Sequence, residues 1–125
     1  MILTLSQVAL GGAIGASLRH LANIGAMRLF GSGFPVSTLF VNTLGSFLMG
    51  VLVSALAFKG GMRFAPFLMT GVLGGFTTFS AFSLDAVTLW DRGQSLTAAG
   101  YVVASVGFSI FALALGSLLA RAVLA

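Results

Sequence analysis

The sequence predicts an all-α integral membrane protein with four transmembrane helices, and three observations lead to this fold class. Of the 125 residues, 58% are hydrophobic and only 6% are charged, whereas a soluble domain carries about 25% charged residues. A soluble chain with so few charges could not cover its own surface. The apolar residues also fall into four runs, and each run reaches the roughly 20 residues that a helix needs to cross a bilayer.

The four spans are expected to follow one another with only short breaks, as one four-helix domain over residues 1–125. We place them at about residues 2–24, 34–58, 64–90 and 96–120. Turn-forming residues lie between them, with Gly31 and Pro35 in the first break, Gly60 in the second and Gly93 in the third. These breaks predict tight connections and antiparallel neighbouring helices.

Small residues recur at helical spacing inside two of the spans. Gly11 and Gly15 lie four residues apart in the first span, as do Gly12 and Ala16. Gly100 and Ala104 have the same spacing in the fourth span, with Gly107 one turn further on. Small residues at this spacing let helix backbones approach closely in lipid. We therefore expect close helix packing at these positions.

The third span carries an unusual central segment, and two interpretations of it stay open. Gly74 and Gly75 stand side by side in the expected helix, and each Gly costs about 1 kcal/mol relative to Ala. Thr77 and Thr78 follow, and their hydroxyls compete for backbone groups. One interpretation is a broken helix that lines an ion or substrate site. The other is a tightly packed helix whose hydroxyls bond to the previous turn.

Two polar stripes accompany this segment. Each recurs every four residues in an otherwise apolar helix: Thr38, Asn42 and Ser46 in the second span, and Tyr101, Ser105 and Ser109 in the fourth. The amide of Asn42 is costly in lipid and must face a partner or a pore. The stripes therefore indicate either a lined pathway or hydrogen bonds between helices.

Phe79 and Phe82 share one face of the third span, since they are three residues apart. Phenylalanines in lipid are usually packing residues. A ring also has a positive edge, however. Two rings turned edge-on to a narrow path could tolerate a small anion.

The inventory of reactive residues makes an enzyme unexpected. The chain has one His, two acidic residues (Asp85 and Asp91) and no Cys. No set of nucleophile, base and acid can be assembled from these. The six cations are scattered singly between apolar runs, so no basic stripe is available to follow a nucleic acid backbone.

The cations are also evenly divided between the two expected membrane faces. One face would carry Lys59, Arg63 and Arg121, and the other would carry Arg19, Arg28 and Arg92. The Lys/Arg imbalance that sets orientation is therefore zero. Either so small a count is uninformative, or both orientations insert and pair as an antiparallel, dual-topology homodimer.

Three motifs in consecutive spans together resemble one known family. They are Gly11-Gly12-x-x-Gly15-Ala16-x-x-Arg19, Thr38-Leu39-x-Val41-Asn42-x-x-Gly45 and Gly71-x-x-Gly74-Gly75-x-Thr77-Thr78-Phe79-Ser80-x-Phe82-Ser83. In this order they resemble the Fluc fluoride channels, also called CrcB proteins, over essentially the whole chain. The resemblance implies a dual-topology homodimer in the cell (inner or plasma) membrane. It also implies selective, passive export of fluoride, which lowers cytoplasmic fluoride and its toxicity.

The resemblance further implies roles for individual residues. The anion pathway would be lined by Asn42, Thr78, Phe79, Ser80, Phe82, Tyr101, Ser105 and Ser109. Arg19 would draw anions into a vestibule. The backbone carbonyls of Gly74 and Thr77 would hold a structural Na⁺ between the subunits. Asp85 stands where family members often carry Glu, so it would be a shorter gating or loading carboxylate; otherwise it is a solvated acid near Arg92.

Two other functions remain as alternatives. A small proton-coupled multidrug-type exporter also has four spans, but it needs a membrane-embedded acid, and Asp85 lies near the end of the third span. A non-transporting assembly subunit would use its polar residues only to join helices. The expected partners are fluoride, a second copy of the chain and the lipid bilayer, with no nucleic acid.

Overall fold

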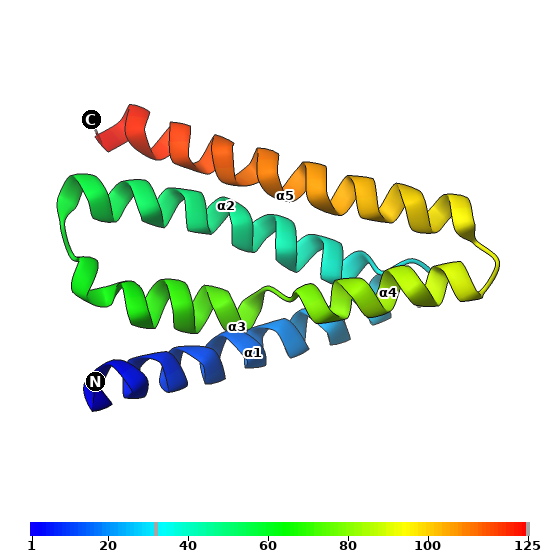
Figure 1. The fold of residues 1–125 in the computed structure, drawn as a ribbon, viewed down its shortest axis with the longest axis horizontal. Coiled ribbons are helices and arrows are strands. Elements are labelled where there is room, and N and C mark those ends of the chain that lie inside the picture. The colour runs from blue at the N-terminus through cyan, green and yellow to red at the C-terminus, as the bar shows by residue number, and fades with distance from the viewer. Residues whose placement is uncertain (32, 125) are drawn as a thin grey trace.

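The computed structural model describes residues 1–31 and 33–124, and the regular secondary structure of these residues consists of helices only (Figure 1). Its elements are α1 (Ile2–Phe30), α2 (Val36–Lys59), η1 (Met62–Phe64), η2 (Pro66–Leu73), α3 (Gly74–Phe76), α4 (Phe79–Asp91) and α5 (Ser95–Leu124). Four described stretches are long and apolar enough to cross a membrane: Ile2–Phe30, Val36–Lys59, Met62–Asp91 and Ser95–Leu124. The prediction of an all-helical protein with four membrane-spanning helices is confirmed.

The first and last helices are longer than the expected spans. α1 continues to Phe30 and α5 to Leu124, because a helix can extend beyond the apolar run that crosses the bilayer. Gly31 and Gly60 end α1 and α2 at positive φ angles of 75° and 81°, which glycine adopts without strain. Residue 32, in the first expected break, lies outside the described residues.

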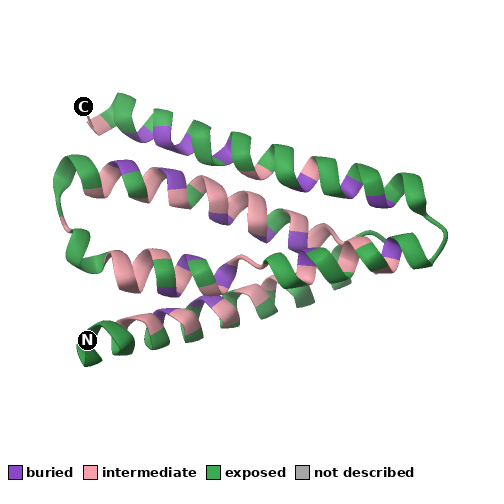
Figure 2. Ribbon diagram, in the orientation of Figure 1, coloured by how far each residue is buried: buried purple, intermediate pink, exposed green. Residues whose placement is uncertain are grey.

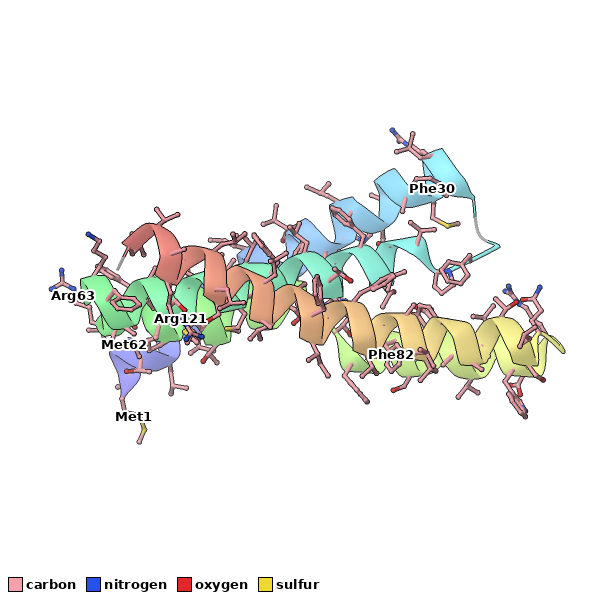
Figure 3. The ribbon with its side chains drawn as sticks, turned by 90° about the horizontal axis from the view of Figure 1, so that it is seen from above. Met1, Phe30, Met62, Arg63, Phe82 and Arg121 are labelled. Atoms are coloured by element: carbon pink, nitrogen blue, oxygen red, sulfur yellow. The ribbon has the colours of Figure 1, made fainter. Side chains whose placement is uncertain are left out.

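The helices pack mainly as two pairs, α2 with α5 and α1 with the first part of the third span. Contacts of α1 with α2 and of α4 with α5 connect the two pairs. α5 packs along α2 and also contacts α4, while α1 packs on η2 and α3. Figure 2 shows buried positions on the facing sides of the helices and exposed positions around the outside. Many large apolar side chains lie on that outer surface. Figure 3 places Met1, Arg63 and Arg121 at one end of the bundle.

Glycines make the closest helix contacts. A methyl group on Gly11 or Gly15 of α1 would collide with the backbone of η2, at Phe67 and Val72 respectively. The expected close packing of the first span is therefore present. On α5 the expectation is wrong within the described part of the chain, because a Cβ on Gly100 or Gly107 would meet nothing from another helix within 4 Å. Gly116 instead packs against the backbone of α2.

The third span changes conformation twice along its length. Its first part, η2, is a π-helix that continues into the single turn of α3. Thr77 (φ −88°, ψ 158°) and Thr78 (φ −153°, ψ 126°) are then extended. α4 begins at Phe79, with the Thr78 hydroxyl accepting a hydrogen bond from the Ala81 N–H as its cap. We call these two extended residues the Thr77–Thr78 link, and Figure 1 shows it between α3 and α4.

Candidate functional site

Asn42 of α2 holds the Thr77–Thr78 link through both halves of its side-chain amide. Its Nδ2 donates to the Thr78 carbonyl at 2.9 Å, and its Oδ1 accepts from the Thr78 N–H at 2.8 Å. A polar side chain in an apolar helix thus meets a backbone that has lost its helical partners. The side-chain amide of Asn42 and the backbone N–H and carbonyl of Thr78 therefore supply each other's hydrogen-bond partners.

The link also leaves backbone carbonyls without their usual helical donors, among them those of Gly74 and Thr77. In a continuous helix the Thr78 N–H would bond to Gly74 O, and the Ala81 N–H would bond to Thr77 O. Here these amides donate to Asn42 Oδ1 and Thr78 Oγ1 instead. Backbone oxygens freed in this way are ligands that a hard cation accepts. Among the described residues, no group of three or more His, Cys, Asp or Glu residues could hold a metal.

Phe79 and Phe82 begin a series of contacting aromatic rings. Their ring centroids are 5.3 Å apart, with the planes at 62° in an edge arrangement. Phe82 then contacts Tyr101 at 5.4 Å, and Tyr101 contacts Phe34 at 5.6 Å. Exposure falls from 76% for Phe79 to 8% for Phe82 and 0% for Tyr101, and rises again to 36% for Phe34. The series therefore runs from the open surface through the chain's core at Tyr101.

A cavity of about 440 Å³ lies beside the two phenylalanines and gathers most of the predicted pathway residues. We call it the phenylalanine cavity. Its lining includes Asn42, Ser46, Thr77, Thr78, Phe79, Phe82, Ser105 and Ser109. The Ser105 hydroxyl is buried and has no hydrogen-bond partner in the described part of the chain. It is therefore a buried polar group at the edge of this cavity whose hydrogen-bonding capacity is not used by the described residues.

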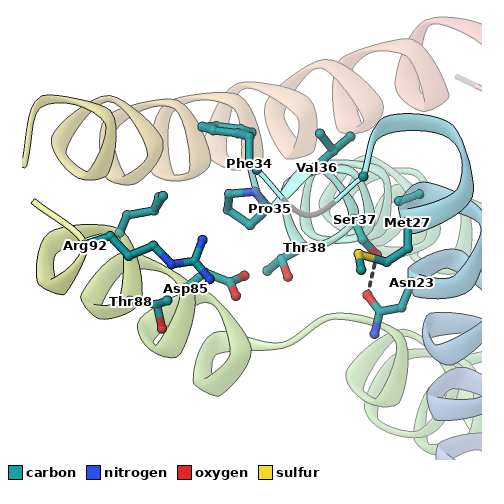
Figure 4. Close-up of a pocket in the computed structure, with 14 residues that line it drawn as sticks. Asn23, Met27, Phe34, Pro35, Val36, Ser37, Thr38, Asp85, Thr88 and Arg92 are labelled. Atoms are coloured by element: carbon teal, nitrogen blue, oxygen red, sulfur yellow. Dashed lines mark hydrogen bonds between the residues drawn. The ribbon is translucent and has the colours of Figure 1, made fainter. Parts of the chain in front are cut away.

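A second cavity, of about 240 Å³, lies toward the far end of α4, and we call it the Asp85 cavity. Its polar lining residues are Asn23, Ser37, Thr38, Asp85, Thr88 and Arg92 (Figure 4). The Tyr101 hydroxyl donates to Asp85 Oδ2 at 3.1 Å. Asp85 and Arg92 thus share a cavity, while Asp85 also has a buried partner on α5.

Both polar stripes reach from one cavity to the other. Thr38 lines the Asp85 cavity, and Asn42 and Ser46 line the phenylalanine cavity. On α5, Tyr101 binds Asp85, while Ser105 and Ser109 line the phenylalanine cavity. The two stripes therefore border the phenylalanine cavity from two helices, and the remaining member of each lies in or beside the lining of the Asp85 cavity.

Four predicted site residues line neither cavity: Gly74 and Tyr101, described above, and Ser80 and Arg19. Ser80 is exposed, and its hydroxyl lies 3.2 Å from the Thr78 hydroxyl. Arg19 is partly buried, and its Nε donates to the Gly75 carbonyl at 3.0 Å. The predicted roles of Ser80 and Arg19 in anion movement stay predictions.

Several polar residues of the Asp85 cavity were not predicted from the sequence: Asn23, Ser37 and Thr88. The Ser37 hydroxyl donates to Asn23 Oδ1 and joins the start of α2 to α1. Thr88 lies three residues after Asp85 and therefore shares its helix face. That spacing was a usable signal for Thr88. Asn23 and Ser37 come from different helices, so nothing in their local sequence places them together.

Comparisons with known proteins place this arrangement in context. The family model described as "CrcB-like protein, Camphor Resistance (CrcB)" matches residues 6–117. A protein of Cereibacter sphaeroides is 68% identical over 116 residues, which is 93% of each chain. One from Ruegeria sp. is 59% identical over 125 residues, 99% of each chain, and one from Paracoccus denitrificans is 53% identical over 122 residues, 98% of each. All three relatives are named fluoride-specific ion channel FluC.

Proposed function

Because this chain belongs to the CrcB-like family, we propose that it is a fluoride-specific ion channel that lets fluoride leave the cell passively. The match to FluC channels over nearly the whole chain carries this conclusion. Four membrane-spanning helices make the protein a multi-pass membrane protein. A channel needs no chemical step, in keeping with the few reactive side chains of the sequence.

The phenylalanine cavity is the proposed anion pathway. Fluoride is small and strongly hydrated, so a pore must replace its water with other donors. The hydroxyls of Ser105 and Ser109 and the ring edges of Phe79 and Phe82 border this cavity. Hydrogen bonds involving a charged group contribute about 1.5–3 kcal/mol each. Several such donors in sequence are therefore required, and the two polar stripes provide them.

The working unit is proposed to be an antiparallel homodimer in which a second copy covers the phenylalanine cavity. Phe79 is 76% exposed although it borders the cavity, and Gly74 is exposed beside the link. An inverted copy would bury both and close the open side of the path. The nearly balanced cations at the two ends of the chain are compatible with insertion in both orientations.

A structural Na⁺ between the two copies is part of the same proposal. The Gly74 and Thr77 carbonyls do not receive their helical hydrogen bonds, because the Thr78 and Ala81 amides donate elsewhere. Two copies would offer four such oxygens, which suit a hard cation. The third span would then act as a broken helix whose link supplies ion ligands as well as pore residues.

Asp85 is proposed to load or gate the ion at the mouth of the pathway. Its carboxylate accepts from Tyr101, and Tyr101 packs against Phe82 of the phenylalanine cavity. A movement of this carboxylate would therefore be transmitted through Tyr101 to the ring of Phe82. The shorter side chain of Asp, compared with the Glu common in the family, reduces its reach.

Fluoride efflux from liposomes containing the purified protein tests the proposed function. The liposomes are loaded with fluoride, and efflux is followed with an electrode under a potassium gradient with valinomycin; chloride-loaded liposomes serve as the control. Fluoride flux without chloride flux is expected. Absence of fluoride flux would overturn the proposal and favour a non-transporting assembly subunit, and flux that requires a proton gradient would favour a coupled exporter.

A further inference from the structure

Arg19 makes a contact that concerns the interruption of the third span rather than either cavity. Its Nε donates to the Gly75 carbonyl at 3.0 Å, across 56 positions of sequence. In an uninterrupted helix that carbonyl would accept from the N–H of Phe79. Phe79 is instead the first residue of α4, after the link. The guanidinium of α1 thus takes the place of a lost helical hydrogen bond.

The charge of Arg19 suits this location. Gly75 lies in the last turn before the link, where α3 ends at Phe76. The carbonyl end of a helix carries partial negative charge and favours a cation. Arg19 is partly buried there, so water screens the contact less than it would at an exposed site. Hydrogen bonds from a charged donor are also stronger than neutral ones.

We propose that Arg19 is a positioning residue that fixes the interruption of the third span from the α1 side. Asn42 holds the link from α2 at Thr78, and Arg19 holds the preceding turn from α1 at Gly75. The two contacts lie on either side of Thr77. Together they set the direction of the freed carbonyls and the start of α4, which carries Phe79. The effect on fluoride flux rests on the proposed function, but the effect on structure does not.

Two substitutions separate the hydrogen bond from the charge. Counting atoms outward from the backbone, Gln has an N–H donor at the position of Arg Nε, so Arg19→Gln keeps the donor and removes the charge. Lys has a methylene group at that position and its ammonium one atom further out. Arg19→Lys therefore keeps the charge and removes the donor from its place. A residue that only attracts anions requires the charge; a positioning residue requires the donor.

Solid-state NMR of the full-length protein in liposomes reads the contact directly. Labelling Gly with ¹³C at the carbonyl and Phe with ¹⁵N selects only the Gly–Phe pairs, which are 33–34, 75–76 and 107–108. The Gly107→Ala variant removes one signal and aids assignment. The Gly75 carbonyl resonance is expected to shift in Arg19→Lys and to stay close to wild type in Arg19→Gln. Lys59→Gln, a neutral substitution at the exposed end of α2, is the control and should leave it unchanged.

Flux measurements on the same samples complete the test. Arg19→Lys should slow fluoride efflux about tenfold, the order that loss of a hydrogen bond to a charged group produces, whereas Arg19→Gln should stay close to wild type. An unchanged Gly75 carbonyl resonance in Arg19→Lys overturns the proposal. Normal fluoride flux through Arg19→Lys together with lost flux through Arg19→Gln also overturns it. If the variants do not fold, dipolar coupling between ¹⁵Nε of Arg and the Gly75 carbonyl carbon in wild type decides. Coupling supports the contact, and its absence overturns it.

Discussion

At the scale of single residues, the two phenylalanines of the proposed pathway have different surroundings although they lie on one helix face. Phe79 is 76% exposed and contacts Phe82 edge-on. Phe82 is 8% exposed and packs between Phe79 and Tyr101. A change at Phe79 therefore alters the surface of the phenylalanine cavity. A change at Phe82 alters both the cavity and the core of the chain.

Replacing either ring with Ile is expected to abolish most fluoride flux, because an aliphatic side chain has no positive edge to face an anion. The stability effects should differ. Phe82→Ile should lower the free energy of unfolding by about 1–3 kcal/mol, as shape changes in packed sites do, whereas Phe79→Ile should change it by less than about 0.5 kcal/mol, as at an exposed site.

Liposome flux and unfolding in detergent measure the two effects separately. Gel filtration of each variant checks that its oligomeric state matches wild type. Normal flux through Phe79→Ile would mean that the exposed ring is only a packing or lipid-facing residue.

Tyr101 and Asp85 are coupled by a hydrogen bond, and a double-mutant cycle can measure its strength. Tyr101 is fully buried, and its hydroxyl donates to Asp85 Oδ2 at 3.1 Å. Tyr101→Phe, Asp85→Asn and the double variant should give a coupling of about 0.6 kcal/mol, the mean for such bonds in membranes, with an upper range of about 1.7 kcal/mol. Unfolding in detergent provides the four free energies. Additive effects would contradict the contact.

The polar stripes could be predicted from the sequence, but the hydrogen-bond partners of their side chains could not. The four-residue spacing of Thr38, Asn42 and Ser46 placed them on one helix line. It could not show that Asn42 binds the backbone of Thr78, because that contact depends on which helix packs beside α2. Arg19 is a similar case. Its sequence position gave its span, but its partner Gly75 became visible only in the packed structure.

At the scale of elements, glycine contacts determine how closely α1 approaches the third span. Gly11 and Gly15 both meet the backbone of η2. Gly12, one residue from Gly11, has open space where a Cβ would stand. The spacing of small residues predicted the contacts of Gly11 and Gly15, but it also selected Gly12 on α1 and Gly100 and Gly107 on α5, where a Cβ would meet nothing within 4 Å. Periodicity does not say which face of a helix meets a neighbour.

These neighbouring glycines form a matched pair for mutation. Gly15→Ala should lower the free energy of unfolding by about 1–3 kcal/mol, because its methyl group would collide with the carbonyl of Val72 and force the helices apart. Gly12→Ala should be neutral or stabilising by up to about 1 kcal/mol, since Ala favours a helix over Gly.

Unfolding of both variants in the same detergent measures the difference. Helix content from circular dichroism checks that α1 itself is intact in each. Equal destabilisation by the two substitutions would contradict the close packing of α1 on η2.

At the scale of the whole molecule, the structure changes the count of cations that face the two sides of the membrane. Arg19 binds a carbonyl beside the Thr77–Thr78 link, within a membrane-spanning stretch, so it does not act as a loop charge. Lys59, Arg63 and Arg121 then belong to the end with the N-terminus, and Arg28 and Arg92 to the opposite end. The even division expected from the sequence becomes three against two.

A difference of one cation is small, so both orientations of the wild-type chain are expected to be present in cells. The orientation rule counts Lys and Arg near the ends of the spans and gives Asp little weight. Arg28→Gln changes the count to three against one and should favour chains whose termini face the cytoplasm. Lys59→Gln changes it to two against two and is the matched control, since both side chains are exposed at the end of a helix.

A C-terminal reporter tag that is modified only on one side of the membrane measures the fraction in each orientation. The wild type and Lys59→Gln should show tags on both sides, and Arg28→Gln should show a majority on the cytoplasmic side. Because an antiparallel dimer requires both orientations, fluoride resistance of cells expressing Arg28→Gln alone should fall with the minority fraction. It should recover when a second variant with the opposite bias is expressed beside it. A wild-type tag found on one side only would contradict dual topology and leave the channel to be formed by parallel copies.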